Sequence, residues 1–111
     1  MKSGQDLYLD MERLQASLTA SLRAFGQRGR DSAQAEANYR IALAEKMLIE
    51  RDNGLPVTIL SDICRGDRKV ADLKLKRDIA ETVYKSAEQA INVYKIQVKI
   101  LEGQIEREYR G

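Results

Sequence analysis

The stretch NGLPVTILSDICRGDRKVADL, residues 53–73, interrupts a chain that otherwise has the composition and periodicity of long helices. An Asn-Gly pair at its start is suited to ending a helix, and Pro56 favours an extended conformation for the residue before it. Thr58 is expected to cap a short helix that Gly66 closes, and Asp67 to cap the helix that follows. The stretch is therefore predicted to be the corner between two long helices, with a short helix inside residues 53–66.

The residues before the corner predict a helix over residues 5–52. Ser3 followed by Asp6 resembles a capping box. Apolar residues then recur at spacings of three and four, which indicates one helical stripe; they are Leu7, Met11, Leu14, Leu18, Leu22 and Phe25. Gly26 and Gly29 each cost about 1 kcal/mol relative to Ala inside a helix. One helix weakened at residues 26–30 and two helices broken there both fit this pattern.

The residues after the corner predict a helix over residues 67–109. Its apolar residues fit the a and d positions of a heptad repeat, with Arg77 as an exception; they are Val70, Leu73, Ala80, Tyr84, Ala87, Ile91, Tyr94, Val98, Leu101 and Ile105. A second apolar stripe lies on another face and comprises Ile79, Val83, Ala90, Val93 and Ile100. Because a helix with two apolar faces is buried on two sides, this stripe is predicted to be an oligomer face. Coverage by the N-terminal half of the same chain is the alternative.

Together these patterns predict an all-α fold in a single domain over residues 1–111. Two long antiparallel helices form a coiled-coil-like hairpin with a short corner helix, and the hairpins assemble into an oligomeric helical bundle. The corner carries several aliphatic side chains, which are expected to cover the end of the hairpin core; they are Leu55, Val57, Ile59, Leu60 and Ile63.

The sequence carries no pattern of a catalytic, cofactor or metal site, and none is predicted. The 111 residues include no His, which removes Ser-His-Asp and Cys-His catalysis and most transition-metal sites. The single Cys64 stands beside Ile63 and is interpreted as a buried structural thiol. One Cys also excludes an internal disulfide and fits a reducing compartment. The carboxylates alternate with cations at the spacing of helix ion pairs.

The net charge of +2 does not indicate a dedicated binder of nucleic acid or membrane surfaces. The best candidate for a partner or nucleic-acid surface is the corner cluster, which comprises Arg65, Arg68, Lys69, Lys74, Lys76 and Arg77. A second, smaller patch comprises Arg23, Arg28 and Arg30. Because acids are interspersed in the corner cluster, a solvated helix face is the favoured interpretation and nucleic-acid binding the alternative. No stretch reaches the ~18 uninterrupted apolar residues of a membrane span.

The segments AEANYRIALAEK and PVTILSDICRGDRKVADLKLKRDIAETVYKSAEQAINVYKIQVKILEGQIEREY resemble a group of small helical proteins encoded by phages and prophages of Gram-positive bacteria. The resemblance covers roughly the last three quarters of the chain. It implies a phage protein in the bacterial cytoplasm that binds a host or phage protein, for instance to inhibit a defence complex. An accessory role in phage recombination or replication and a purely structural oligomer are the alternatives.

Overall fold

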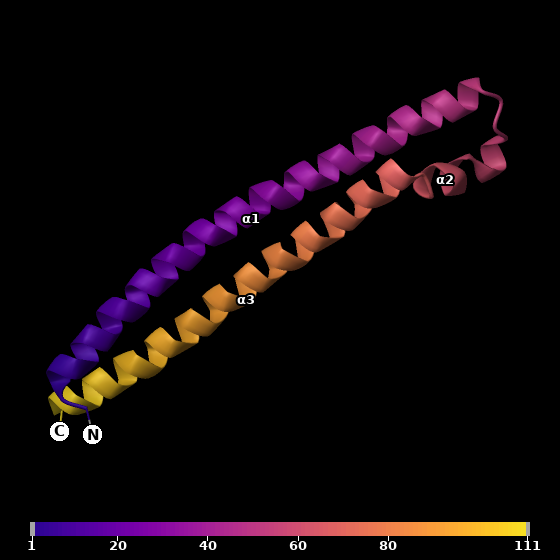
Figure 1. Ribbon diagram of the computed structural model, residues 1–111. Coiled ribbons are helices and arrows are strands. Elements are labelled where there is room, and N and C mark those ends of the chain that lie inside the picture. The colour runs from indigo at the N-terminus through magenta and orange to yellow at the C-terminus, as the bar shows by residue number, and fades with distance from the viewer. Residues whose placement is uncertain (1, 111) are drawn as a thin grey trace. The chain divides into compact units, whose positions relative to one another are not determined.

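The computed structural model describes residues 2–110, in which three helices follow one another (Figure 1). Helix α1 spans Gly4–Asp52, α2 spans Val57–Arg65 and α3 spans Arg68–Arg110. No strand occurs in this part of the chain. The described residues divide into two compact units. Unit 1 combines residues 2–27 with residues 85–110, and unit 2 comprises residues 28–84.

The ends of the helices follow from local hydrogen bonds. At the start of α1, the amide of Asp6 donates to Ser3 Oγ at 3.1 Å and the amide of Ser3 donates to the Asp6 carboxylate at 3.4 Å, which is the predicted capping box. Gly54 adopts φ of 89° just after α1, a conformation that favours glycine. At the start of α3, the amide of Val70 donates to the carboxylate of Asp67 at 3.3 Å, as predicted. The predicted cap of α2 by Thr58 is wrong, because the helix begins at Val57 after Pro56 and has no side-chain cap.

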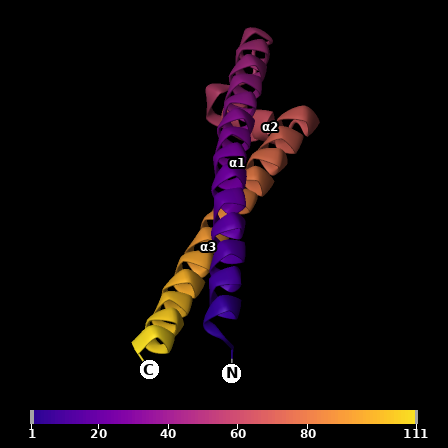
Figure 2. The ribbon, with the colours of Figure 1, turned by 90° about the vertical axis from the view of Figure 1, so that its left-hand side faces the viewer.

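In unit 1, the first half of α1 and the second half of α3 run antiparallel (Figure 2). A Cβ added to Gly4 would lie 3.6 Å from Glu108 Cγ, so the start of α1 and the end of α3 meet. Leu7 of α1 and both Ile91 and Leu101 of α3 are buried. Apolar contact along the two facing stripes therefore holds this unit together.

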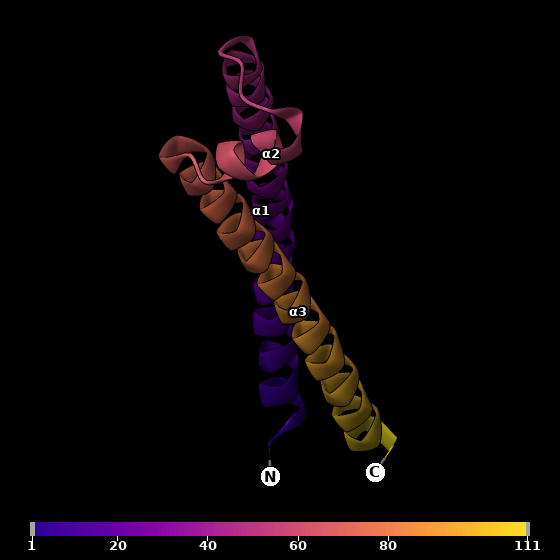
Figure 3. The same cartoon turned by 90° about the vertical axis from the view of Figure 1, so that its right-hand side faces the viewer.

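In unit 2, the second half of α1 packs against the first half of α3, and α2 connects the two helices in the chain (Figure 3). Tyr39, Ala42 and Val70 form a buried cluster, against which Leu43 and Leu73 pack. On α2, Leu60 and Cys64 are buried, and Cys64 has no exposed surface. A helix of nine residues thus contributes one narrow buried edge to this unit.

The heptad predicted for α3 is confirmed at every position, since all ten residues are buried or partly buried. Arg77 also occupies this face and is partly buried. In α1, partly buried positions follow the same spacing up to Phe25, but three residues on Arg28 is exposed, and the series continues four residues on at Gly29. Two successive steps of four form a stutter, which locally unwinds a coiled coil. The predicted weak point therefore corresponds to a change of phase, although α1 is helical throughout.

Four predicted core positions in the helices and corner are corrected. Leu22 is half exposed, because Ser21 takes the inward position in its turn of α1. Of the corner aliphatics, only Leu60 is fully buried. Val57, Ile59 and Ile63 are 76%, 44% and 52% exposed, so they do not cover the core of the chain that carries them.

Candidate interaction surfaces

The predicted oligomer face is exposed along α3. In unit 2, Ile79 is 54% and Val83 is 40% exposed; in unit 1, Val93 is 52% and Ile100 is 58% exposed. Ala90 is exposed as well. The alternative that the chain's own N-terminal half covers these residues is therefore wrong. The aliphatic side chains face solvent because the seam that packs on α1 occupies another side of the helix.

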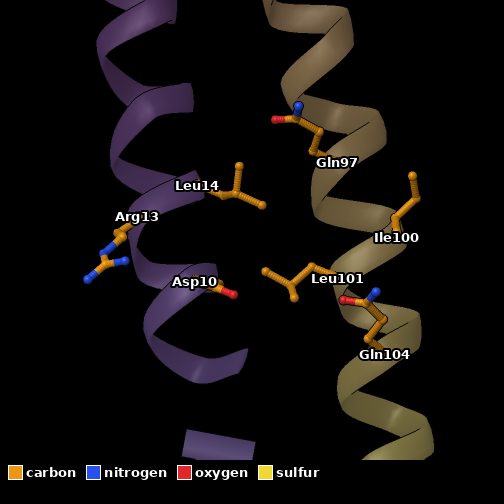
Figure 4. A pocket seen from close by; sticks show the side chains of 7 residues that line it. All are labelled: Asp10, Arg13, Leu14, Gln97, Ile100, Leu101 and Gln104. Atoms are coloured by element: carbon orange, nitrogen blue, oxygen red, sulfur yellow. The ribbon is translucent and has the colours of Figure 1, made fainter. Parts of the chain in front are cut away.

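An open groove of about 410 Å³ lies between α1 and α3 of unit 1 (Figure 4). It is lined by Asp10, Arg13, Leu14, Gln97, Ile100, Leu101 and Gln104. Leu14 and Leu101 point toward each other between the helices, whereas Ile100 points away from α1. Asp10 forms an ion pair with Lys2 at 2.5 Å. The groove therefore has an apolar floor, and its α3 edge belongs to the exposed face of that helix.

Half of the corner cluster is paired with acids of unit 2. Lys74 pairs with Asp78 at 3.3 Å, and Lys76 pairs with Asp72 at 3.1 Å; both pairs have the predicted spacing of helix ion pairs. These ion pairs lie on the surface, and in each of them the carboxylate cancels most of the attraction that the lysine would exert on a distant anion. Half of the six cations are engaged in this way, once Arg77 is included.

Arg77 is the most enclosed member of the cluster. Its guanidinium lies 4.6 Å from the ring centroid of Tyr39, 3.0 Å from Asp78 and 3.5 Å from Glu36. The hydrogen bond from Arg77, followed by that from Lys74, lowers the pKa of Asp78 below its ordinary value against the opposing effect of burial. The hydrogen bond to Asp78 in turn raises the pKa of Arg77. This constellation joins α1 to α3, and Arg77 is better described as a structural residue than as part of a binding surface.

The remaining cations of the cluster are free. Arg65, Arg68 and Lys69 are exposed and make no ion pair with any residue between 2 and 110. They surround the connection between α2 and α3, while Asp67 in the same connection faces Lys46 at 3.6 Å. The charged corner therefore reduces to three unpaired cations.

The smaller basic patch is divided between the two units. Arg23 belongs to unit 1, whereas Arg28 and Arg30 belong to unit 2. Arg28 pairs with Asp31 at 3.6 Å, and Arg30 is also engaged by a neighbour. The patch therefore offers few free charges.

A second apolar surface, which is not among the predicted ones, lies on α2. Val57, Ile59 and Ile63 are exposed there, and Leu60 and Cys64 are buried on the other side of the same helix. A helix with aliphatic residues on nearly every side signals contact on two sides, as on α3. The arrangement of the aliphatic residues within 57–63 carries this signal, whereas their number alone predicts only a buried core.

Neither the side-chain chemistry of the described residues nor a comparison with known proteins assigns a function to these surfaces. Between residues 2 and 110, no cluster of three or more His, Cys, Asp or Glu side chains is placed to hold a metal ion. None of the helices in that range combines the length and the apolar character needed to cross a membrane. Neither a known protein family, nor a curated protein, nor a solved structure matches this chain.

Proposed function

We propose that this chain is a non-enzymatic protein–protein interaction module that works as a homo-oligomer. The observation that carries the proposal is the exposed aliphatic face of α3, where Ile79, Val93 and Ile100 are each more than half exposed. Single exposed aliphatic residues are normal, but a repeated row on one helix face marks an interaction site. Fully burying an exposed aliphatic side chain contributes roughly 1.5–3 kcal/mol, and each of these half-exposed side chains can contribute part of that on association.

The non-enzymatic part of the proposal rests on the side chains available. The sequence has no His, and its one thiol, on Cys64, has no exposed surface. A nucleophilic thiol needs access and an electropositive setting, whereas a fully buried thiol packs as a small apolar group. Cys64 therefore serves the packing of α2.

Light scattering coupled to size exclusion tests the proposal. The wild-type chain is expected to have the mass of a dimer or a larger oligomer at micromolar concentration. A Val83→Glu, Val93→Glu, Ile100→Glu variant is expected to be monomeric and still helical by circular dichroism, since all three residues face solvent in the single chain. A monomeric wild-type chain would sink the proposal.

The resemblance to phage-encoded helical proteins supports a wider role for the module. We propose that the oligomer binds a host or phage protein in the bacterial cytoplasm, as an inhibitor of a defence complex would. A pull-down from host lysate is expected to recover one stoichiometric protein. A purely structural oligomer, which is the alternative, recovers none.

A nucleic-acid-binding accessory is the second candidate, favoured by the exposed and unpaired Arg65, Arg68 and Lys69. Three cations contact few phosphates, so affinity for DNA should be low and should fall with salt along a shallow slope. Titration with short single- and double-stranded DNA measures this slope. Replacement of Arg68 and Lys69 by Ala should then reduce the slope by about two. Tight binding unchanged by these replacements would exclude this surface as the site.

A further inference from the structure

The part of α3 that belongs to unit 2 combines cations and aliphatic residues on one exposed side. Arg68 and Lys69 lie in the first turn of α3 and are exposed. Leu75 follows Arg68 after seven residues, and seven residues of an α-helix are close to two full turns. Ile79 and Val83 continue this side at steps of four. We call these five residues the basic aliphatic face; its aliphatic side chains are 57%, 54% and 40% exposed in chain order.

The two cations at the start of the basic aliphatic face have no counter-charge. Neither Arg68 nor Lys69 forms an ion pair with any residue between 2 and 110. Asp72 lies on the same side of α3, but it is paired with Lys76 at 3.1 Å. Cations in the first turn of a helix are also repelled by the positive end of the helix dipole, and the first turn of α3 contains no acid. A carboxylate from a partner would therefore be attracted to this position.

Acids of the neighbouring segments do not supply the missing counter-charge. The carboxylate of Asp67, in the connection before α3, lies 3.6 Å from Lys46 of α1. Helix α2 meets the start of α3 at this connection (Figure 3). Its exposed charges are Asp62 and Arg65, neither of which forms an ion pair within residues 2–110. Because these two charges have opposite signs, α2 adds no net charge, and the excess of positive charge at the start of α3 remains.

The mixture of side chains on the basic aliphatic face selects the kind of partner. Nucleic acid would engage the cations through its phosphates but would leave the aliphatic side chains in water. An anionic membrane would cover both, but it would bring the carboxylate of Asp72 against headgroups of the same charge. An acidic amphipathic helix can pack its apolar stripe on the aliphatic residues and place a carboxylate at the guanidinium of Arg68. It can also leave the pair between Asp72 and Lys76 intact.

We propose that the basic aliphatic face binds an acidic amphipathic helix of another protein. Carboxylates of that helix pair with Arg68 and Lys69, and its aliphatic side chains pack on Leu75, Ile79 and Val83. The inference rests on the proposed role of the chain as an interaction module, and it names the chemistry of the protein that the module binds. Because the cations lie at one end of the face only, the charge pairs also fix the direction of the bound helix.

A synthetic peptide tests the proposal. The Glu peptide is a fluorescein-labelled helix of about 18 residues, which covers the roughly 23 Å between residues 68 and 83, with Leu along one side and Glu along the edges. Fluorescence anisotropy with the full chain measures its binding. A Gln peptide, in which Gln replaces every Glu, and a Ser peptide, in which Ser replaces every Leu, are each expected to bind about tenfold more weakly.

Variants of the chain locate the contact. In Arg68→Gln, Lys69→Gln, binding of the Glu peptide should weaken about tenfold and binding of the Gln peptide should not change, since only the first contains the charge pairs. Arg23→Gln is the matched control, because Arg23 is an exposed cation of unit 1 with no ion pair to residues 2–110. Ile79→Ser should weaken binding of both peptides. Ile41→Ser should weaken neither, although Ile41 of α1 is 57% exposed.

Two further probes distinguish the other occupants. A chain that does not bind the Glu peptide, or binds it equally well in Arg68→Gln, Lys69→Gln, would overturn the inference, while the proposed self-association stands on its own measurement. Binding of phosphatidylserine vesicles or of a short DNA duplex, without binding of the Glu peptide, would assign the cations to lipid or nucleic acid and would overturn it as well. A monomeric wild-type chain that recovers no protein from lysate would overturn the proposed function and, with it, the protein partner inferred here.

Discussion

Single residues on α2 show how one short helix divides its aliphatic side chains. Leu60 is 6% exposed, whereas Ile59, its neighbour, is 44% exposed. A buried aliphatic residue that is cut to Ala loses its transfer free energy and leaves a cavity, but an exposed one loses little of either. The two residues therefore test the assignment of the buried side directly.

Leu60→Ala is expected to lower the free energy of unfolding by about 2–4 kcal/mol. Ile59→Ala and Ile63→Ala should each lower it by less than about 1 kcal/mol, because their side chains remain largely in solvent. Urea unfolding followed by circular dichroism measures all three, at a concentration where each variant is monomeric. Equal losses for Leu60→Ala and Ile59→Ala would contradict the orientation of α2.

Arg77 determines the titration of one carboxylate. The largest cause of the lowered pKa of Asp78 is its hydrogen bond from Arg77. A lowered pKa in the folded state stabilises the fold above the ordinary Asp pKa, and this contribution is lost as the pH falls through the folded pKa. Arg77→Gln is therefore expected to raise the pKa of Asp78 and to move acid unfolding to higher pH.

Carboxyl chemical shifts in an NMR titration give this pKa directly. Lys76→Gln is the matched control, because Lys76 pairs with Asp72 and should leave the titration of Asp78 unchanged. An unchanged pKa of Asp78 in Arg77→Gln would show that Lys74 alone is responsible.

At the scale of the helices, the sequence is sufficient for the ends of α1 and α3 and for the seam of α3, but not for the start of α2. The caps at Ser3 and Asp67 and the heptad, with Arg77 as its exception, are local properties of the chain. The inward side of α1 was harder, because Ser21 and Leu22 both fit a step of three or four from Leu18. Hydropathy favoured Leu22, whereas the structure places Ser21 inward. Which side of a two-faced helix is buried depends on its neighbour, and periodicity alone does not identify that neighbour.

Two glycines within the long helices differ in the room that they leave for a side chain, so replacing each by Ala distinguishes the effect of helix propensity from that of packing. A Cβ added at Gly103 meets only Arg107 Nη1, at 3.7 Å, whereas one added at Gly29 meets the Tyr84 ring at 3.1 Å. Gly103→Ala should therefore raise the free energy of unfolding by about 1 kcal/mol. Gly29→Ala should gain less or lose stability, since the ring must shift. Thermal unfolding of both variants checks this, and an equal gain would show that Tyr84 yields freely.

At the scale of the whole molecule, two kinds of surface compete for partners. The corner offers three free cations beside exposed aliphatic residues of α2, and α3 offers its exposed aliphatic face. Partners held by these surfaces respond differently to ionic strength. Salt screens exposed charges but strengthens or leaves unchanged the burial of apolar groups.

Self-association through the exposed aliphatic face of α3 is therefore expected to depend weakly on salt. The dissociation constant, measured by sedimentation equilibrium, should change by less than about threefold between about 0.05 and 0.5 M NaCl, although the Debye length falls from roughly 14 to 4 Å. An interface of surface ion pairs would weaken strongly over the same range. Contacts of the corner cations with phosphates would weaken too, because each contact releases counterions into a more concentrated solution. If the oligomer dissociated in high salt, charged residues such as Lys95 and Lys99, and not Val93 and Ile100, would have to form the contact.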